Sequence, residues 1–145
     1  MKLLHAFAAG LAGAVTLTIA HQLLHKIVDD APRMDLMGEE ALNKIADKVD
    51  VDIPKEKQFG ITMAGDIAGN TLYYALAEIG KTKYATTRGG LMGLLAGIGG
   101  VFLPKHIGLT NEYSDRTFKT QLMTIGLYTL GGLVAGKVAD TLNKA

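Results

Sequence analysis

One acidic residue interrupts an otherwise apolar stretch near the middle of the sequence. Asp66 lies within residues 58–79, a segment with the length and composition of a membrane-spanning helix. An aspartate at mid-span costs about 2.5–3.5 kcal/mol of insertion free energy, and such residues usually face the protein interior or a water-filled cavity. Asn70 follows one helical turn later and Tyr73 about one turn after that, so the three side chains share one helix face. This polar stripe predicts either a path for an ion or proton, or a hydrogen-bonded contact between helices.

Two histidines one helical turn apart form a second candidate site. His21 and His25 share a helix face, and such a pair can ligate a divalent cation when other ligands complete the shell. His106 would emerge at the same end of a four-helix bundle, which makes His21, His25 and His106 candidate ligands for a divalent metal or a haem. The glutamate of an HExxH zinc motif is missing. The alternative is that these histidines are anchored at the interface or hydrogen-bonded.

Four nearly uncharged stretches would position these residues. They cover about residues 3–25, 58–79, 85–104 and 119–139. A bilayer core of roughly 30 Å needs about 20 helical residues, so each stretch is near spanning length. Hydrophobic residues make up 48% of the 145 residues and charged residues 20%, and the clustering of the charges favours a membrane protein over a soluble helical bundle. We expect one all-α membrane domain over residues 1–145, a bundle of four transmembrane helices.

The long polar segment between the first two spans contains an amphipathic helix. Apolar residues recur at helical spacing over about residues 35–50, with Asp35 placed to cap the helix and Pro54 placed to stop it. Its polar face mixes acids with lysines, which argues against recognition of anionic lipids. We expect this helix to lie at the membrane interface or on the end of the bundle, and a lid or a partner-docking helix is the alternative.

Small residues are spaced for close helix packing in every expected span. In lipid, GxxxG pairs and related small-xxx-small pairs let two helix backbones approach closely. Ala9 and Gly13 form such a pair in the first span. The candidate packing glycines are Gly13, Gly65, Gly69, Gly93, Gly97, Gly132 and Gly136. The sequence leaves open whether they pack within one chain or also between copies.

Several function classes find no support in the sequence. The chain has no cysteine, which excludes disulfides, thiolate metal sites and cysteine nucleophiles. It has neither a phosphate-binding loop nor a nucleophile elbow. A net charge of +1 without a basic stripe gives no footprint for nucleic acid. The sequence therefore favours a protein that is not an enzyme.

The loop charges give a prediction of orientation. Four spans place both chain ends and the loop of residues 81–88 on one side of the membrane. That loop carries Lys81, Lys83 and Arg88 within eight residues. Because basic residues next to spans are retained on the inside, we expect this side to be cytoplasmic, in a bacterial inner membrane.

Three functions follow as hypotheses, each with the lipid bilayer as a partner. The first is a small channel or transporter, assembled as a homo-oligomer, in which Asp66, Asn70 and Tyr73 line a polar path. The second is a non-catalytic accessory or scaffold subunit that binds another protein in a membrane complex. The third is a membrane protein that binds a metal or haem through its histidines.

Overall fold

The structure is a computed structural model that describes residues 2–144, a range that is helical and contains no strand. The α-helices of this range are α1 (Lys2–Ile27), α2 (Met34–Lys48), α3 (Lys55–Ala75), α4 (Ala85–Phe102), α5 (Glu112–Asp115) and α6 (Phe118–Leu142). Short 3-10 helices join some of them: η1 (Leu76–Glu78), η2 (Thr82–Tyr84) and η3 (Pro104–Ile107). The all-α class predicted from the sequence is confirmed.

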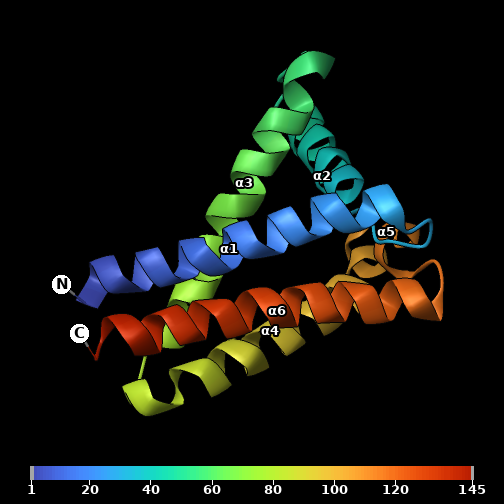
Figure 1. Cartoon of the computed structure of the whole chain (residues 1–145). Coiled ribbons are helices and arrows are strands. Elements are labelled where there is room, and N and C mark those ends of the chain that lie inside the picture. Colours follow the sequence, from blue (N-terminus) through green and yellow to red (C-terminus); the bar gives the residue numbers. More distant parts are fainter. Residues whose placement is uncertain (1, 145) are drawn as a thin grey trace.

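Three long helices, α1, α4 and α6, form the body of the molecule (Figure 1). α6 packs extensively against both α4 and α1. The beginning of α1, the end of α6 and the turn before α4 lie at one end of this helical body, and the turn after α1 lies at the other end with α5. Both ends of the chain therefore lie at the same end of the body.

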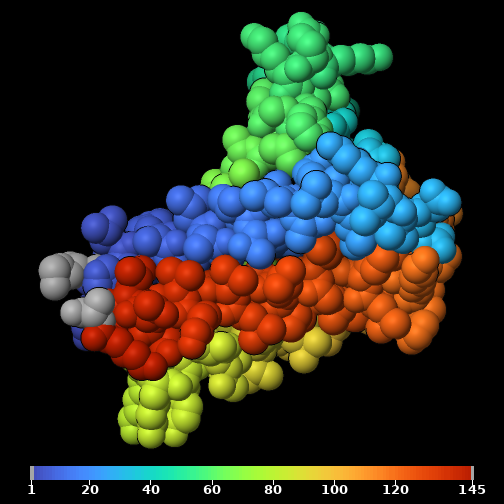
Figure 2. Space-filling model, in the orientation of Figure 1, coloured from blue at the N-terminus to red at the C-terminus, as the bar shows by residue number. Residues whose placement is uncertain are grey.

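The remaining long helix, α3, crosses the body at a steep angle. Its first half stands away from the body together with α2, and the two helices form a projecting hairpin (Figures 1 and 2). α3 contacts α1 and α2, but it contacts α4 only slightly. The tip of the α2–α3 hairpin is exposed and charged, since it contains residues 47–52 and the first turn of α3.

The prediction of a four-span bundle is not confirmed. Of the described helices, α1 and α6 are long and apolar enough to cross a membrane. α3 begins with charged Lys55, Glu56 and Lys57, and α4 has only 18 residues and includes Arg88. The interior of α3 contains the polar residues Asp66 and Asn70, and the short α4 contains Arg88, so the mean hydropathy of both helices is lower than that of α1 and α6.

α1 exposes apolar side chains along its whole length. They recur at every fourth position, in a row that winds gradually around the helix: Leu3, Phe7, Leu11, Val15, Ile19, Leu23 and Ile27. The 26 residues of α1 extend over about 39 Å. Exposed apolar side chains also cover α4 and α6, among them Leu91, Leu95, Ile98, Phe102, Phe118, Leu122, Leu130 and Leu133. Soluble monomeric proteins rarely expose apolar surface of this extent.

Small residues bring α6 close to its two neighbours. A Cβ atom on Gly132 would overlap the carbonyl oxygen of Gly89, and one on Gly97 would lie 2.6 Å from the Cα of Ile125. Gly13, Gly93 and Gly136 face the backbone of a neighbouring helix in the same way. Gly65 and Gly69 differ, because no atom lies within 4 Å of the position that their Cβ would take. These two glycines of α3 face outward.

The amphipathic helix α2 forms, but its ends differ from the prediction. Arg33 occupies the N-cap position, and Asp35, within the first turn, accepts hydrogen bonds from the Arg33 guanidinium. α2 ends at Lys48, and the chain turns through Asp50, whose φ of 55° is in the left-handed region. Pro54 is the N-cap residue of α3, so it begins the following helix instead of stopping α2.

Candidate functional site

A small cavity lies where α1, α2, α3 and α6 meet. Its volume is about 20 Å³, which is room for one water molecule. Its polar lining consists of Thr18, His21, Asp35, Asp66, Thr124 and Tyr128, and its apolar lining of Leu17, Met34, Met63 and Leu127. We name Thr18, His21, Asp35 and Asp66 the junction site, because they join the first three helices around this cavity.

Asp66 is held by two neutral donors. Its Oδ1 accepts a hydrogen bond of 2.9 Å from the Asn70 side-chain amide, one turn along α3. Its Oδ2 accepts a longer hydrogen bond, of 3.4 Å, from the Thr18 hydroxyl of α1. Within residues 2–144, no cationic group lies within 4 Å of the Asp66 carboxylate. An ionised Asp66 would therefore have hydrogen bonds but no opposite charge in contact with it.

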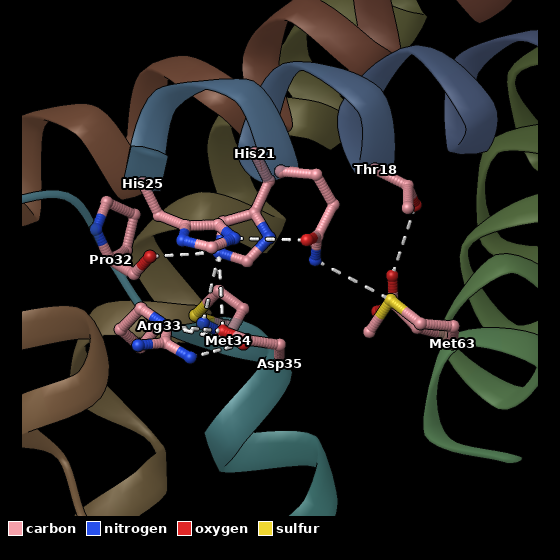
Figure 3. Close-up of polar contacts among 10 residues, drawn as sticks. Thr18, His21, His25, Pro32, Arg33, Met34, Asp35 and Met63 are labelled. Atoms are coloured by element: carbon pink, nitrogen blue, oxygen red, sulfur yellow. Dashed lines mark hydrogen bonds and ion pairs between the residues drawn. The ribbon is translucent and has the colours of Figure 1, made fainter. Parts of the chain in front are cut away.

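His21 joins the end of α1 to the beginning of α2 (Figure 3). The side chain is buried, and its Nε2 lies 2.9 Å from the carbonyl oxygen of Pro32 and 3.3 Å from the backbone nitrogen of Met34. We assign the ring proton to Nε2, because the closer partner is a carbonyl oxygen that needs a donor. In the neutral ring, Nδ1 then carries the free lone pair. Nε2 also lies 3.9 Å from Asp35 Oδ1.

The charge of Asp35 is neutralised by Arg33 in a bidentate ion pair (Figure 3). Arg33 Nε donates to Asp35 Oδ1 at 3.0 Å, and Arg33 Nη2 donates to Oδ2 at 2.7 Å. Burial raises the pKa of the Asp35 carboxyl. The hydrogen bonds and the positive charge of Arg33 lower this pKa by more than burial raises it, so the pKa lies below its usual 3.8. The hydrogen bonds to Asp35 also raise the pKa of Arg33. Of the two acids of the junction site, Asp66 is thus the one without a counter-charge.

The three histidines of the metal hypothesis are not gathered in one cluster. The rings of His21 and His25 have centroids 5.6 Å apart, and His25 Nε2 lies 3.0 Å from the Gln22 amide oxygen. His106 lies in η3 and is exposed. Within the described part of the chain, no group of three or more histidine, aspartate or glutamate side chains is arranged to hold a metal ion. Metal or haem binding by these residues stays a hypothesis, and it would require a change at His21.

The polar stripe on α3 divides into two parts. Asp66 and Asn70 contact each other at the junction site, but the Tyr73 hydroxyl donates to the carbonyl oxygen of Met92 in α4 at 2.9 Å. Its neighbour Tyr74 is fully buried and donates to the carbonyl oxygen of Tyr128 in α6 at 2.7 Å. Both tyrosines thus connect α3 to the helical body, and the cavity contacts α3 through Met63 and Asp66.

An apolar cluster fills the body beside the cavity. It consists of Leu17, Tyr74, Leu127 and Ala135, all buried. Two of its members, Leu17 and Leu127, also line the cavity. The cavity is therefore bounded by this packed apolar cluster on one side.

The sequence did not predict the roles of two residues of the junction site, Thr18 and Asp35, or that of Arg33, which pairs with Asp35. Thr18 precedes His21 by three positions, so the helical spacing could have indicated it as part of the same polar face. Asp35 was interpreted as a helix cap, and Arg33 was not considered. Arg33 and Asp35 reach the site because the turn after α1 folds the beginning of α2 back onto His21. The spacing of residues in the sequence does not indicate this tertiary contact.

No known protein family, curated protein or solved structure matches this chain. The junction site and the apolar exterior are therefore the features from which a function can be inferred.

Proposed function

We propose that the protein is an integral membrane protein that transports a small cation through the junction site. The observation that carries this proposal is the position of Asp66. Its carboxylate lies beside a water-sized cavity, hydrogen-bonded only to neutral donors, within a molecule whose long helices expose many apolar side chains. Acids in such settings commonly mark ion or proton pathways in membrane proteins.

The apolar exterior supports insertion in a lipid bilayer. Only 33% of the most apolar window of α1 and 39% of that of α6 are buried, whereas the core helix of a soluble protein is mostly buried. Lipid would cover the exposed stripe of α1. In this proposal α4 lies in the membrane beside α6, and the charged tip of the α2–α3 hairpin lies at the interface. Both chain ends face the cytoplasm of a bacterial cell.

The surroundings of the cavity favour a gated carrier over an open channel. The first turn of α2 covers the cavity, because Met34 and Asp35 line it. Leu17, Tyr74, Leu127 and Ala135 fill the adjacent body. Transport would then require α2 or α3 to move relative to α1, and the hydrogen bond between Thr18 and Asp66 joins two of the surfaces that would separate.

Ion flux through the purified protein in liposomes tests this proposal. Separate gradients of Na⁺, K⁺ and protons are imposed, and the decay of each is followed with a fluorescent indicator. We expect the protein to dissipate at least one gradient and Asp66→Asn to slow that decay by roughly 100-fold. Asp47→Asn, at the exposed hairpin tip, is the matched control and should be as active as the unaltered protein. Decay no faster than in empty liposomes for all three ions would refute the proposal.

A second candidate function is that of a non-catalytic subunit in a membrane complex, with copies of itself or with another protein. Helix α3 favours it, because its outward side presents Gly65 and Gly69 without a packing partner. Native mass spectrometry of the protein released gently from its membrane would reveal a homo-oligomer or a heteromer. A monomer under these conditions would contradict this second function.

A further inference from the structure

Building on the proposed function, we propose that the transported ion is a proton, which Asp66 exchanges with His21 through a single water molecule in the cavity. This inference names the substrate of the same site. It therefore depends on transport taking place, but it can fail while the transport proposal holds.

The size and ligands of the cavity favour a proton over a metal cation. A volume of about 20 Å³ holds one water molecule, not a hydrated ion. Ca²⁺ and Mg²⁺ take six or more oxygen ligands. The junction site offers two carboxylates, and Asp35 is already paired with Arg33. The surrounding parts of α1 and α3 are regular helix, so their carbonyl oxygens are used in helical hydrogen bonds. A proton needs none of these additional ligands.

The charges around Asp66 lead to the same conclusion. The ionisable groups that face the cavity or adjoin it are His21 and His25 on α1, the Arg33–Asp35 pair at the beginning of α2, and Tyr128 on α6. None of the described cations forms an ion pair with Asp66. An isolated charged carboxylate is costly to bury, and one bound proton removes that charge. Asp66 is therefore suited to hold a proton while its site is closed.

His21 is placed to receive the proton. It lines the same water-sized cavity as Asp66. The O–H bond of the Asp66 carboxyl breaks as its proton passes to the water, and that water gives one of its own protons to His21 Nδ1. The products are a carboxylate, an unchanged water molecule and an imidazolium. Asp35 Oδ1, 3.9 Å from Nε2, stabilises the imidazolium, and the reverse transfer restores the starting state.

Infrared difference spectroscopy of the full chain in liposomes tests the proton-carrying role. Asp66 should give a protonated-carboxyl C=O band that appears and disappears as the pH is cycled. The band should be absent in Asp66→Asn and retained in the control Asp47→Asn. A titrating carboxyl band that persists unchanged in Asp66→Asn would overturn the assignment. Thermal melting of each variant verifies that it is folded.

Ion selectivity separates this inference from the proposed function. We expect the protein to dissipate a pH gradient at a rate unaffected by replacing Na⁺ with K⁺, and His21→Gln to slow this decay by about tenfold. Dissipation of a Na⁺ or K⁺ gradient without proton movement would overturn the inference but leave cation transport standing. Decay of no gradient would refute both. Equal proton rates for His21→Gln and the unaltered protein would exclude the relay through His21.

Discussion

Gly89 of α4 and Gly132 of α6 lie back to back, so that a Cβ atom on either residue would overlap the carbonyl oxygen of the other. The atoms in the way are backbone atoms, which cannot move out of the way by a change of rotamer as the end of a flexible side chain can. Neighbouring glycines continue this contact along both helices: Gly93, Gly97 and Gly136. The distance between α4 and α6 therefore depends on the absence of side chains along this contact.

The first prediction concerns this contact. Gly132→Ala should lower the free energy of unfolding by about 1–3 kcal/mol, because the added methyl group forces the helices apart. Gly126→Ala is a control on the same helix, since no atom lies within 4 Å of its Cβ position. It should be neutral or stabilising by up to about 1 kcal/mol through helix propensity. The melting temperatures of the two variants in detergent measure these effects. Equal melting temperatures for Gly132→Ala and Gly126→Ala would show that the α4–α6 contact has room for a methyl group.

The second prediction concerns the link between α3 and α6. Tyr74→Phe removes the hydroxyl that donates to the Tyr128 carbonyl oxygen and should cost about 1 kcal/mol of stability. Tyr84→Phe is the control, because Tyr84 is 50% exposed and its hydroxyl can bond water in either state. Thermal melting in detergent compares the two variants. Destabilisation by Tyr84→Phe alone would contradict the placement of α3.

The third prediction is a pH dependence at the beginning of α2. Because the pKa of Asp35 in the folded protein lies below its usual 3.8, the stability from its charge is complete above that value. It is lost as the pH falls through the folded-state pKa. Asp35→Asn should therefore cost about 1–2 kcal/mol near neutral pH, a figure reduced for the partial exposure of Arg33.

The pH dependence of melting in Asp35→Asn tests this prediction. Melting temperatures are compared from about pH 6 down to about pH 3 for the unaltered protein and Asp35→Asn. The gap between the two should narrow as the pH falls. A gap that stays constant or widens toward acid would mean that the charge of Asp35 does not stabilise the fold.

The fourth prediction concerns membrane topology. The chain contains no cysteine, so single cysteines can be introduced without removing native ones. Lys83→Cys in η2 and Lys105→Cys in η3 lie at exposed positions near opposite ends of the helical body. A membrane-impermeant maleimide should label them from opposite faces of the membrane, with Lys83→Cys on the cytoplasmic face. Labelling of both from one face would exclude a body that crosses the bilayer.

Helix positions could be predicted from the sequence more fully than helix arrangement. The apolar run expected over 119–139 corresponds to Phe118–Leu142, and the amphipathic pattern over 35–50 corresponds to Met34–Lys48. Periodicity and hydropathy act within one segment, so they locate these elements well. They contain no information on the crossing angle of α3, which depends on the partner that each face contacts.

The glycine pairs show the same limit. The pair at Gly65 and Gly69 has the same spacing as the pair at Gly93 and Gly97, yet the first faces outward and the second packs against α6. A GxxxG pattern indicates that a helix can approach a neighbour closely, and it does not say on which side that neighbour lies. The partners of His21 were unpredictable for a similar reason, since Pro32 and Asp35 reach it only through tertiary folding.

The most direct test of the central claim compares two substitutions at Asp66 in the same proton-uptake measurement. Liposomes containing the unaltered protein, Asp66→Glu or Asp66→Asn are given the same membrane potential, negative inside. The acidification of their interior is then recorded. We predict rapid uptake by the unaltered protein, measurable uptake by Asp66→Glu, which keeps a carboxyl group, and uptake at the empty-liposome rate by Asp66→Asn. Uptake by Asp66→Asn as fast as that of the unaltered protein would contradict the claim that Asp66 carries the transported proton.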